Sequence, residues 1–456
     1  MVRSPTTYAD WYRRPALGLA YLCSYLRANS LECRIFDAYY NSWSEDELCD
    51  RVTAYSPGLV GLTAMTHEIV TAARIASRVR MHLRMTAVIG GCHCTALPER
   101  TLSEFPVFDY GICGEAEAAL LALVRCLEHA DSRGLEAVDG VVFRRGQEVV
   151  TNGRAVPLDH DDLDCYPMPA FDDYYGNHKV LRKRNAAYVL ISSRGCPFSC
   201  AFCMRVLGSK VRRRSAESVC DEMEVAIERY GAHTFDFCDD TLLYRDGKTR
   251  DLLDLMVARG LQVKASWCGV TRADQVDRTT ARMAKASGCF RLGIGVESGD
   301  DTVLETINKG ITVEQVKSAV AILKEAGIAV DAYFIVGHPN ETEESLRKTL
   351  ELAVELNADT IAVGLMVPYP GTRIHQMATR GEGGYRLLTE DWTKYDKYGG
   401  RALELEGLPH EDLVRWQRRI VLRPYIKNRR FLDLARYVWV RRRALSFFAK
   451  RHLAGP

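Results

Sequence analysis

The chain has 456 residues, which corresponds to two or three domains at about 150 residues each. Hydrophobic residues make up 47% of the chain and charged residues 26%, a balance that excludes disordered and fibrous classes. No apolar run approaches the ~18–20 residues that span a bilayer, and no charged-then-apolar leader opens the chain. We therefore expect a cytoplasmic protein without an integral membrane segment.

Charge and cysteine content narrow the class further. The formal net charge is +2, but the segment from Arg415 to Pro456 holds 13 Lys and Arg residues against one acid, so the rest of the chain is acidic. No basic stripe runs through this acidic body, and we expect no nucleic-acid partner. Because the chain is large and leaderless, its 15 cysteines are expected to be reduced thiols rather than a disulfide framework.

The N-terminal part of the chain alternates strand and helix patterns. Apolar residues recur at helical spacing over 15–28, and further segments follow in chain order: strands at 33–37, 59–63 and 86–90, and a helix at 115–130. This alternation predicts βαβ units and a parallel sheet, with ligands beyond the carboxyl ends of the strands. We assign residues 1–157 to an α/β domain with a Rossmann-like, doubly wound sheet.

A second βα series follows a connector. Residues 158–185 are assigned as a linker, because six acids and two prolines fall within 158–176. Residues 186–384 are predicted to form a partial (β/α)6 barrel, with Ser215 as a helix N-cap and strands at 188–192, 234–238, 262–267, 290–296, 330–336 and 360–366. Residues 385–456 are assigned as a basic helical region, either a lid on the barrel or a membrane-surface helix.

The strongest chemical signal is the loop Arg194-Gly-Cys-Pro-Phe-Ser-Cys-Ala-Phe-Cys203. Three thiolates this close can converge on one metal centre, and soft ligands select an iron–sulfur cluster or zinc. A structural zinc site needs four closed ligands, and three unrelated buried thiols would not need Gly195 and Pro197 to shape the loop. We therefore favour an open-edged [4Fe-4S] cluster held by Cys196, Cys200 and Cys203.

At these residues the chain resembles the radical S-adenosylmethionine (SAM) superfamily. The resemblance implies that the unique iron binds SAM and that one electron releases a 5′-deoxyadenosyl radical, which abstracts hydrogen from a small-molecule substrate. It also implies a one-electron donor such as flavodoxin or ferredoxin. Phe202, beside the third cysteine, would pack near the adenine.

Further matches fall where later strands end. Phe237-Cys-Asp-Asp240 resembles the segment that meets the SAM amino group, which assigns Asp240, and Gly293–Gly299 resembles the segment whose Glu297 and Ser298 reach the ribose or methionine. Gly337, in Phe334–Glu341, resembles a backbone position that lines the adenine. Each segment also has a plain structural interpretation, such as a helix cap or a turn. Arg272 is either a contact to the SAM carboxylate or a surface arginine.

The N-terminal domain resembles the cobalamin-binding domain of one radical SAM subgroup, in its segments 14–22, 90–95 and 114–117. Two departures count against a bound cobalamin without excluding it. Only Met1–Pro5 stands where a full first strand is expected, so the sheet should have a hole or be completed otherwise. There is also no Asp-x-His-x-x-Gly signature, and His93 is the one ligand-type residue in the expected cofactor loops.

Chain length and these motifs resemble the radical SAM diol-dehydratases of aminoglycoside biosynthesis. This resemblance implies cobalamin-independent dehydration of an aminosugar-like substrate and a partner NAD(P)H dehydrogenase that reduces the product. Carboxylates such as Asp239, Asp240, Asp331 and Glu341 could receive a polycation. The alternative is a cobalamin-dependent C- or P-methyltransferase. A non-catalytic sensor is disfavoured, because all three cysteines and the Glu297 segment are present.

Overall fold

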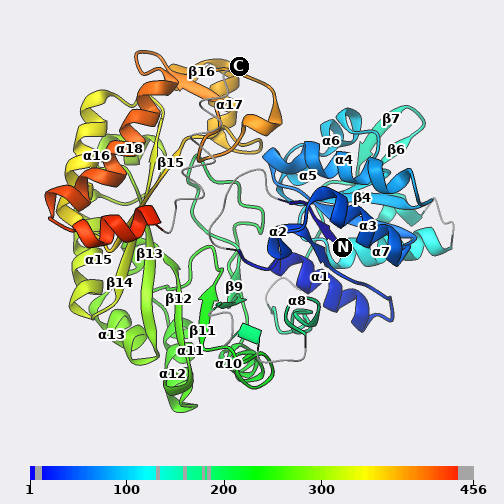
Figure 1. The fold of residues 1–456 in the computed structure, drawn as a ribbon, viewed down its shortest axis with the longest axis horizontal. Helices are drawn as coiled ribbons and strands as arrows, with labels where there is room; N and C mark the ends of the chain where they lie inside the picture. Colours follow the sequence, from blue (N-terminus) through cyan, green and yellow to red (C-terminus); the bar gives the residue numbers. More distant parts are fainter. Residues whose placement is uncertain (6–12, 130–133, 158–161, 177–179, 182–185, 440–456) are drawn as a thin grey trace. The chain divides into compact units, whose positions relative to one another are not determined.

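The computed structural model describes residues 1–5, 13–129, 134–157, 162–176, 180–181 and 186–439. The chain divides into two compact units, Met1–Tyr174 and Tyr175–Pro456, and each is described by itself (Figure 1). The division falls within the predicted connector, 158–185. Parts of that connector, and residues 440–456 of the predicted basic tail, lie outside the described residues.

The first unit is a Rossmann-like α/β domain, as the sequence predicts. Its seven-stranded sheet has the order β2-β1-β3-β4-β5-β6-β7, in which the first five strands are parallel and β6 and β7 form an antiparallel edge that the sequence reading missed. The strands are β1 (Val2–Arg3), β2 (Phe36–Asp37), β3 (Leu59–Thr63), β4 (Thr86–Gly90), β5 (Tyr110–Ile112), β6 (Val141–Arg145) and β7 (Glu148–Thr151). The principal helices are α1 (Leu17–Ala28), α3 (Glu45–Tyr55), α4 (Ile69–Arg80), α6 (Pro98–Glu104) and α7 (Glu117–Glu128).

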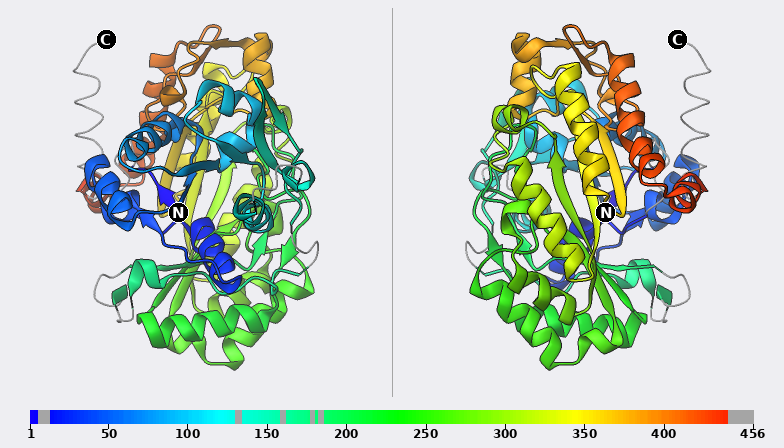
Figure 2. Two further views of the ribbon diagram at one scale, coloured as in Figure 1. Left: turned by 90° about the vertical axis from the view of Figure 1, so that its right-hand side faces the viewer. Right: turned by 90° about the vertical axis from the view of Figure 1, so that its left-hand side faces the viewer.

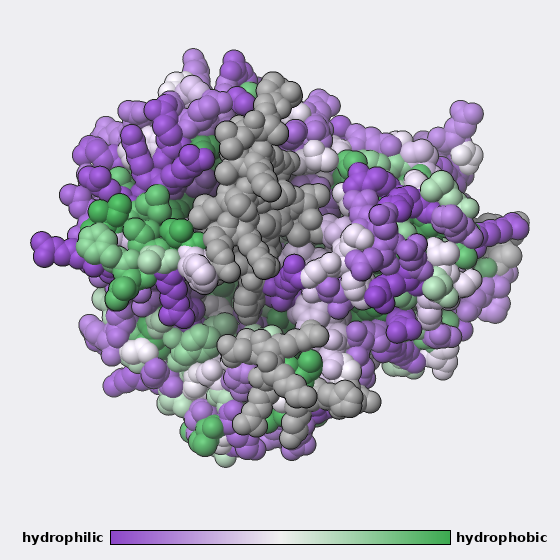
Figure 3. Space-filling view, viewed as in Figure 1, coloured by the Kyte–Doolittle hydropathy of each residue, from purple (hydrophilic) through white to green (hydrophobic). Residues whose placement is uncertain are grey.

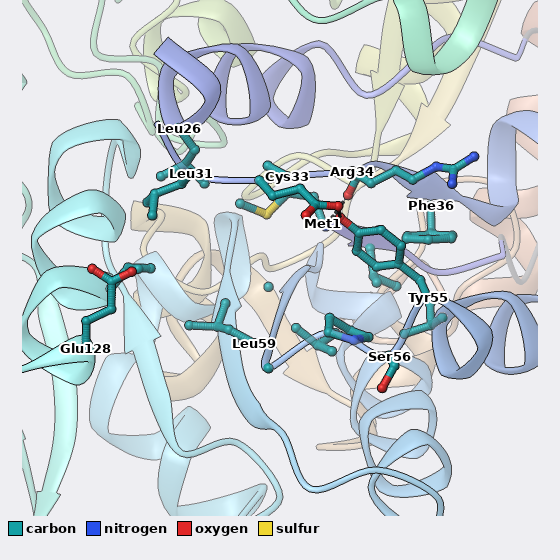
Figure 4. A pocket seen from close by; sticks show the side chains of 18 residues that line it. Met1, Leu26, Leu31, Cys33, Arg34, Phe36, Tyr55, Ser56, Leu59 and Glu128 are labelled. Atoms are coloured by element: carbon teal, nitrogen blue, oxygen red, sulfur yellow. Dashed lines mark hydrogen bonds between the residues drawn. The ribbon is translucent and has the colours of Figure 1, made fainter. Parts of the chain in front are cut away.

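The predicted hole in this sheet is present. Strand β1 has two residues, and the Met1 amine donates to the Arg34 carbonyl at 2.6 Å while the Phe36 amide donates to the Met1 carbonyl at 2.7 Å. Met1 therefore occupies a normal ladder position between β2 and β3. Where the strand would continue toward its amino end, a cavity of about 420 Å³ is lined mainly by apolar side chains (Figure 4). Burial of the Met1 amine lowers its pKa.

Residues 171–174 of the predicted connector pack onto the first unit. Phe171 is fully buried, and the Tyr174 hydroxyl donates to the Asp37 carboxylate at 3.1 Å. The Asp173 carboxylate pairs with Arg27 at 2.9 Å. These aromatic and ionic contacts hold residues 171–174 against α1 and β2, whereas the acidic composition had suggested a solvated stretch.

The second unit contains the predicted partial barrel. Its six-stranded sheet has the order β15-β14-β13-β12-β11-β8, and every pair is parallel. The strands are β8 (Tyr188–Leu190), β11 (Thr234–Phe237), β12 (Ser266–Thr271), β13 (Cys289–Glu297), β14 (Ala329–Val336) and β15 (Thr360–Leu365). The third strand begins at Ser266, so the predicted strand at 262–267 was placed too early, because Gly260 starts the short helix α12 (Leu261–Lys264).

Helices line the outer side of this sheet (Figure 2). They are α10 (Ala216–Val225), α11 (Gly247–Ala258), α13 (Arg278–Ala286), α15 (Val313–Glu325) and α16 (Glu343–Leu356), while α14 (Asp301–Thr306) follows β13 and α17 (Arg373–Arg380) follows β15. Ser215 caps α10 as predicted, accepting from the Ser218 amide at 3.0 Å. Strands β9 (Ser193–Arg194) and β10 (Arg212–Arg213) form a small antiparallel pair that frames the cysteine loop.

The C-terminal region is helical only in part. It begins with an antiparallel pair, β16 (Tyr385–Leu387) and β17 (Leu403–Leu405), and continues with α18 (His410–Lys427), which contacts α16 and β15. Apolar side chains gather on the visible face over α18 and the helical residues after it, including Leu422, Ile426, Phe431 and Leu432 (Figure 3). No helix among the described residues is long and apolar enough to cross a membrane.

Candidate functional site

The cysteine loop lies at the carboxyl edge of the barrel sheet, directly after β8 and β9. Gly195 opens the loop with φ +92°, and a Cβ there would lie 2.2 Å from the Lys210 carbonyl oxygen. Only glycine meets both conditions, because side chains strongly disfavour this conformation and the space is taken. The predicted role of Gly195 in shaping the loop is thus explained.

The loop is braced from one turn of the chain. The Ala201 amide donates to the Ile307 carbonyl at 2.8 Å, and the Asn308 side chain donates to the Ser199 carbonyl and hydroxyl at 3.1 and 2.7 Å. The turn that follows α14 therefore fixes the middle of the cysteine loop. These hydrogen bonds couple the position of the cysteine loop to the conformation of this turn.

The three cysteines share one neighbourhood. The pKa of the Cys203 thiol is raised to about 11, first by desolvation and then by the nearby Cys200, Asp240 and Cys196, while Lys309 lowers it. Thiolates are the ligand form, so iron must displace these protons when it binds. No group of three His, Cys, Asp or Glu among the described residues is arranged for a single metal ion. A cluster needs a different arrangement, because each cysteine binds a separate iron. Three thiols on one loop fit that donor set.

A buried ion pair stands beside the loop. The Lys309 ammonium lies 2.7 Å from the Glu297 carboxylate, and both side chains are less than a tenth exposed. Glu297 has φ +66° at the end of β13, where the register with β14 shifts. A non-glycine residue held in this conformation costs free energy of order 1–3 kcal/mol and is found mostly at functional sites. The predicted site residue Glu297 is thus set in a special backbone position, with a cation that the sequence reading did not assign.

Phe202 joins this group from the cysteine loop. Its ring lies 5.7 Å from the Lys309 ammonium and 6.5 Å from the His338 ring. The His338 Nε2 atom is 3.3 Å from the Glu297 carbonyl oxygen, and burial lowers the pKa of His338 to about 4. His338 is therefore neutral, and it contributes packing and a hydrogen bond rather than a charge.

Gly337 is held by a carboxyl group and a phenol. Its amide and that of His338 donate to Glu341 at 2.6 and 3.1 Å, and its carbonyl accepts from the Tyr385 hydroxyl at 3.0 Å. Burial raises the pKa of Glu341 to about 8 and raises that of Tyr385. The backbone predicted to line the adenine is thus fixed at three points.

The two aspartates after β11 have different tasks. Asp239 is fully enclosed and accepts from the Ser192 amide and hydroxyl and from the Ser193 hydroxyl at 2.6–3.1 Å. Burial raises its pKa against these bonds. Asp240 is exposed, and desolvation raises its pKa while a hydrogen bond from the Gly195 amide lowers it. Asp240 therefore keeps an accessible carboxylate beside the cysteine loop, and its contact with the SAM amino group stays a prediction.

Other predicted residues are engaged elsewhere. Ser298 is fully buried, contacts the Thr349 hydroxyl at 3.2 Å and accepts from the Asp300 amide, so its side chain serves the turn into α14. Asp331 lies in the first half of β14 and pairs with Arg291. With Asp239 and Glu341 also committed, three of the four acids proposed to receive a polycation hold the barrel together instead.

Sequence reasoning missed Lys309 and misjudged Arg272. Arg272 is only 6% exposed, and its guanidinium reaches Cys200 and the Lys309 carbonyl, so the surface interpretation is wrong. Arg272 directly follows β12, but the predicted strand ended at residue 267, so the sequence analysis did not place Arg272 at a strand end. Lys309 follows a helix rather than a strand, and its proximity to Glu297 depends on the fold of the turn.

The carboxyl edge of the first unit's sheet is a second candidate site. Its strand order places a topological switch point between β1 and β3, where doubly wound sheets of this order bind cofactors. The His93 amide donates to the Ala64 carbonyl at 3.3 Å, which ties the loop after β4 to the loop after β3. Gly91 has φ +93°, and a Cβ there would lie 2.7 Å from the Thr63 hydroxyl. Glycine at this position therefore lets the loop after β4 pack closely against the loop after β3.

His93 belongs beneath this edge rather than on it. It is fully buried, and desolvation lowers its pKa to about 4. Its burial favours a structural role over that of a cobalt ligand. The loops after β3 and β4 lie at the switch point of the sheet, where a cofactor would bind against them.

Comparisons with known proteins decide the family. A sequence profile of the Radical SAM superfamily matches residues 190–353, and one of the B12 binding domain matches residues 12–124. The chain is 30% identical over 422 residues to a Pyrococcus horikoshii protein named "Uncharacterized methyltransferase PH0819", covering 91% of this chain and 88% of the relative. The chain belongs to the radical SAM superfamily, in the group that carries an N-terminal B12-binding domain.

Two further relatives bear on function and fold. The chain is 30% identical over 379 residues to an anaerobic magnesium-protoporphyrin IX monomethyl ester cyclase of Cereibacter sphaeroides, covering 79% of this chain and 60% of the relative. The solved structure of the radical SAM methyltransferase TsrM from Kitasatospora setae, with cobalamin and a [4Fe-4S] cluster bound, matches with a TM-score of 0.73. It is 16% identical and covers 91% of this chain and 90% of TsrM, which shows the shared fold.

These matches revise the expected chemistry. The chain is a radical SAM enzyme with a B12-binding domain, and its relatives are named as methyltransferases and cyclases. The expected lean toward aminoglycoside diol dehydration, a lyase reaction, finds no support, and neither does the partner dehydrogenase. The matched B12 binding domain favours cobalamin, against the two departures weighed from the sequence.

Proposed function

We propose that the chain is a cobalamin-dependent radical SAM methyltransferase, which transfers a methyl group from SAM to an unactivated carbon or phosphorus of a small molecule. The observation that carries this proposal is the retained B12-type unit. Its β1/β3 switch point lies at the carboxyl edge of the sheet, where doubly wound sheets of this order bind cofactors. The same chain holds the cysteine loop and aligns over 91% of its length with a protein named as a methyltransferase.

Bound cluster and cobalamin would supply one-electron reduction of the SAM sulfonium and a carrier for the methyl group. The residues of this chain bind and orient. Cys196, Cys200 and Cys203 ligate iron, and Asp240 accepts from the SAM amino group. Glu297 accepts a hydrogen bond from the ribose or the methionine moiety of SAM. Lys309, which pairs with Glu297, supplies the positive charge for the SAM carboxylate.

Phe202 and the backbone at Gly337 complete the adenine site. Gly337 is fixed by Glu341 and Tyr385, so the adenine edge meets a rigid backbone rather than a mobile loop. Rigid placement limits the reorganisation needed when SAM binds. A one-electron donor such as flavodoxin or ferredoxin is part of the proposal, because the reaction consumes electrons.

Oxidative ring closure is the second candidate. The cyclase of Cereibacter sphaeroides supports it, at the same 30% identity as the methyltransferase relative but over a smaller share of this chain. The two reactions differ in what becomes of SAM. Methyl donation leaves S-adenosylhomocysteine, whereas reductive cleavage leaves 5′-deoxyadenosine and methionine.

The test is anaerobic reconstitution with iron, sulfide and hydroxocobalamin, followed by dithionite and SAM. We expect stoichiometric cobalamin uptake by visible absorbance, and both S-adenosylhomocysteine and 5′-deoxyadenosine by mass spectrometry. A protein that binds cobalamin and forms 5′-deoxyadenosine without S-adenosylhomocysteine contradicts methyl transfer. Absence of cobalamin uptake contradicts both cobalamin-dependent candidates.

A matched variant locates the cobalamin site. In Gly91→Val the added side chain meets Thr63 and the Ala64 carbonyl at the edge of the first unit. We expect lost cobalamin uptake with unchanged iron content, because the cysteine loop belongs to the second unit. Full cobalamin uptake by this variant would place the cofactor elsewhere.

A further inference from the structure

Arg272 is aimed at one cluster ligand. It directly follows β12 and is 6% exposed. Its Nε and Nη2 donate to the Asp274 carboxylate at 3.0 and 3.3 Å, and Nη2 also donates to the Lys309 carbonyl at 2.7 Å. Its Nη1 lies 3.8 Å from the Cys200 Sγ and donates to it. The Phe198 ring lies 3.6 Å from the guanidinium carbon.

These contacts leave the guanidinium one orientation. The guanidinium is a planar fork whose N–H groups point in fixed directions, and its two bonds to Asp274 set the rotation of that plane. The Phe198 ring stacks on the same plane. With the Lys309 carbonyl holding Nη2, the remaining arm must point at Cys200. The N–H···S contact is therefore built into the fold.

The consequence is electrostatic, and it rests on the proposed cluster at Cys196, Cys200 and Cys203. Reduction adds one electron to the cluster, so a cation that donates to a ligand sulfur stabilises the reduced state more than the oxidised state. We propose that Arg272 raises the reduction potential of the cluster through its Nη1–H bond to the Cys200 sulfur. The Asp274 carboxylate, paired with the same guanidinium, limits the size of that effect.

Residues other than Arg272 hold the cysteine loop in place. Asn308 and the Ala201 amide hold the cysteine loop to the turn after α14 through uncharged hydrogen bonds. Removal of the Asn308 side chain changes no charge near the sulfur. Arg272 is thus a positioning residue with an electronic effect, and Asn308 is the matched structural control.

The experiment is a potentiometric titration of SAM-free, reconstituted enzyme followed by electron paramagnetic resonance. We compare wild type with Arg272→Met, Arg272→Lys, Asp274→Asn and Asn308→Ala. We expect a shift to more negative midpoint potential in Arg272→Met and a smaller shift of the same sign in Arg272→Lys, which keeps a charge but loses the fork. Asp274→Asn should shift the potential in the positive direction, because it unmasks the guanidinium charge.

The control separates electronic from structural effects. Asn308→Ala should keep the wild-type potential and release iron faster to a chelator. An unchanged midpoint in Arg272→Met with a full cluster would overturn the proposal, and so would equal shifts in Asn308→Ala and Arg272→Met. If Arg272→Met loses iron, the other two variants decide. A negative shift in Arg272→Lys with a positive shift in Asp274→Asn supports the proposal, and the opposite signs overturn it. A wild-type protein without a cluster would instead refute the site on which this inference rests.

Discussion

The carboxyl edges of the two sheets differ in the groups that hold their loops in place. In the second unit the edge is crowded with polar side chains that already have partners: Arg272 with Asp274, Lys309 with Glu297, and Glu341 with the Gly337 amide. In the first unit Gly91 lets the loops after β3 and β4 pack closely through their backbones, and Asp37 at the end of β2 pairs with Arg3 at 3.5 Å. The difference indicates two kinds of recognition. Fixed charges suit a small charged nucleotide and a cluster, whereas loops held together through their backbones suit a large cofactor bound through its surface.

The sharpest way to break this comparison is to remove a cluster ligand. Cys200→Ala should abolish the full cluster, because the loop supplies only three thiols and each binds a separate iron. Iron and sulfide analysis after reconstitution should fall from about four of each per chain. Cys165→Ala, at an exposed cysteine of the first unit, should keep the wild-type content. A full cluster in Cys200→Ala would refute the ligand assignment.

The next largest effect is expected at the buried pair. Lys309→Met leaves the Glu297 carboxylate buried without its cation, and loss of one partner of such a pair costs about 3–5 kcal/mol. We expect a clear fall in melting temperature and weaker SAM binding by calorimetry.

The double variant Glu297→Gln with Lys309→Met sharpens this test. It should recover much of the stability, because no buried charge remains, without recovering SAM binding. Recovery of both would show that the pair has no role in recognition. Equal stability of Lys309→Met and wild type would contradict the buried pair itself.

The pH dependence of stability tests the fixed backbone at Gly337. Burial raises the pKa of Glu341 from 4.5 to about 8, so the folded state binds a proton that the unfolded state releases. Its contribution is present below pH 4.5 and is lost as pH rises toward 8, an effect of order 1–3 kcal/mol. Melting temperatures of Glu341→Gln should therefore fall less than those of wild type between pH 5 and 8. His338, whose amide donates to Glu341, has its pKa lowered to about 4. Its contribution to stability is therefore lost on acidification, in the opposite pH direction. Parallel pH profiles for the variant and wild type would contradict the raised pKa.

The smallest expected effect concerns the hole beside β1. Addition of Val-Leu before Met1 would extend the strand level with the start of β3 and place apolar side chains in the cavity of about 420 Å³ (Figure 4). Burial of one such side chain contributes about 1.5–3 kcal/mol, and ordering each added residue costs about 1–2 kcal/mol. A gain near 1 kcal/mol should appear as a few degrees in melting temperature. A Gly-Ser extension is the control, and an equal gain from it would show that the cavity does not accept a strand.

The sequence predicted what depends on local pattern. Strand β3 and strand β4 lie at the predicted bounds, Ser215 caps α10, and the short Met1–Pro5 segment announced the hole in the sheet. The cysteine loop could be read directly, because its three ligands are neighbours in the chain. Local pattern failed at 262–267, where Gly260 in a left-handed conformation turns an apolar run into a helix.

The features of the site that the sequence did not predict depend on tertiary contacts. Lys309 meets Glu297 only because the turn after α14 folds back onto the cysteine loop through Asn308. Asp331 was counted among the possible substrate carboxylates, but its place in the first half of β14 and its bond to Arg291 remove it from the carboxyl edge. Composition cannot distinguish a carboxylate reserved for a ligand from one that holds a barrel together.

One measurement tests the central claim most directly: reductive cleavage of SAM by the second unit's cysteine loop. Reconstituted enzyme, dithionite and SAM are incubated without oxygen, and 5′-deoxyadenosine is quantified by mass spectrometry against Cys200→Ala. We predict that wild type forms 5′-deoxyadenosine and the variant forms none. A protein with a full cluster that binds SAM but never forms 5′-deoxyadenosine, with any substrate, would contradict the account.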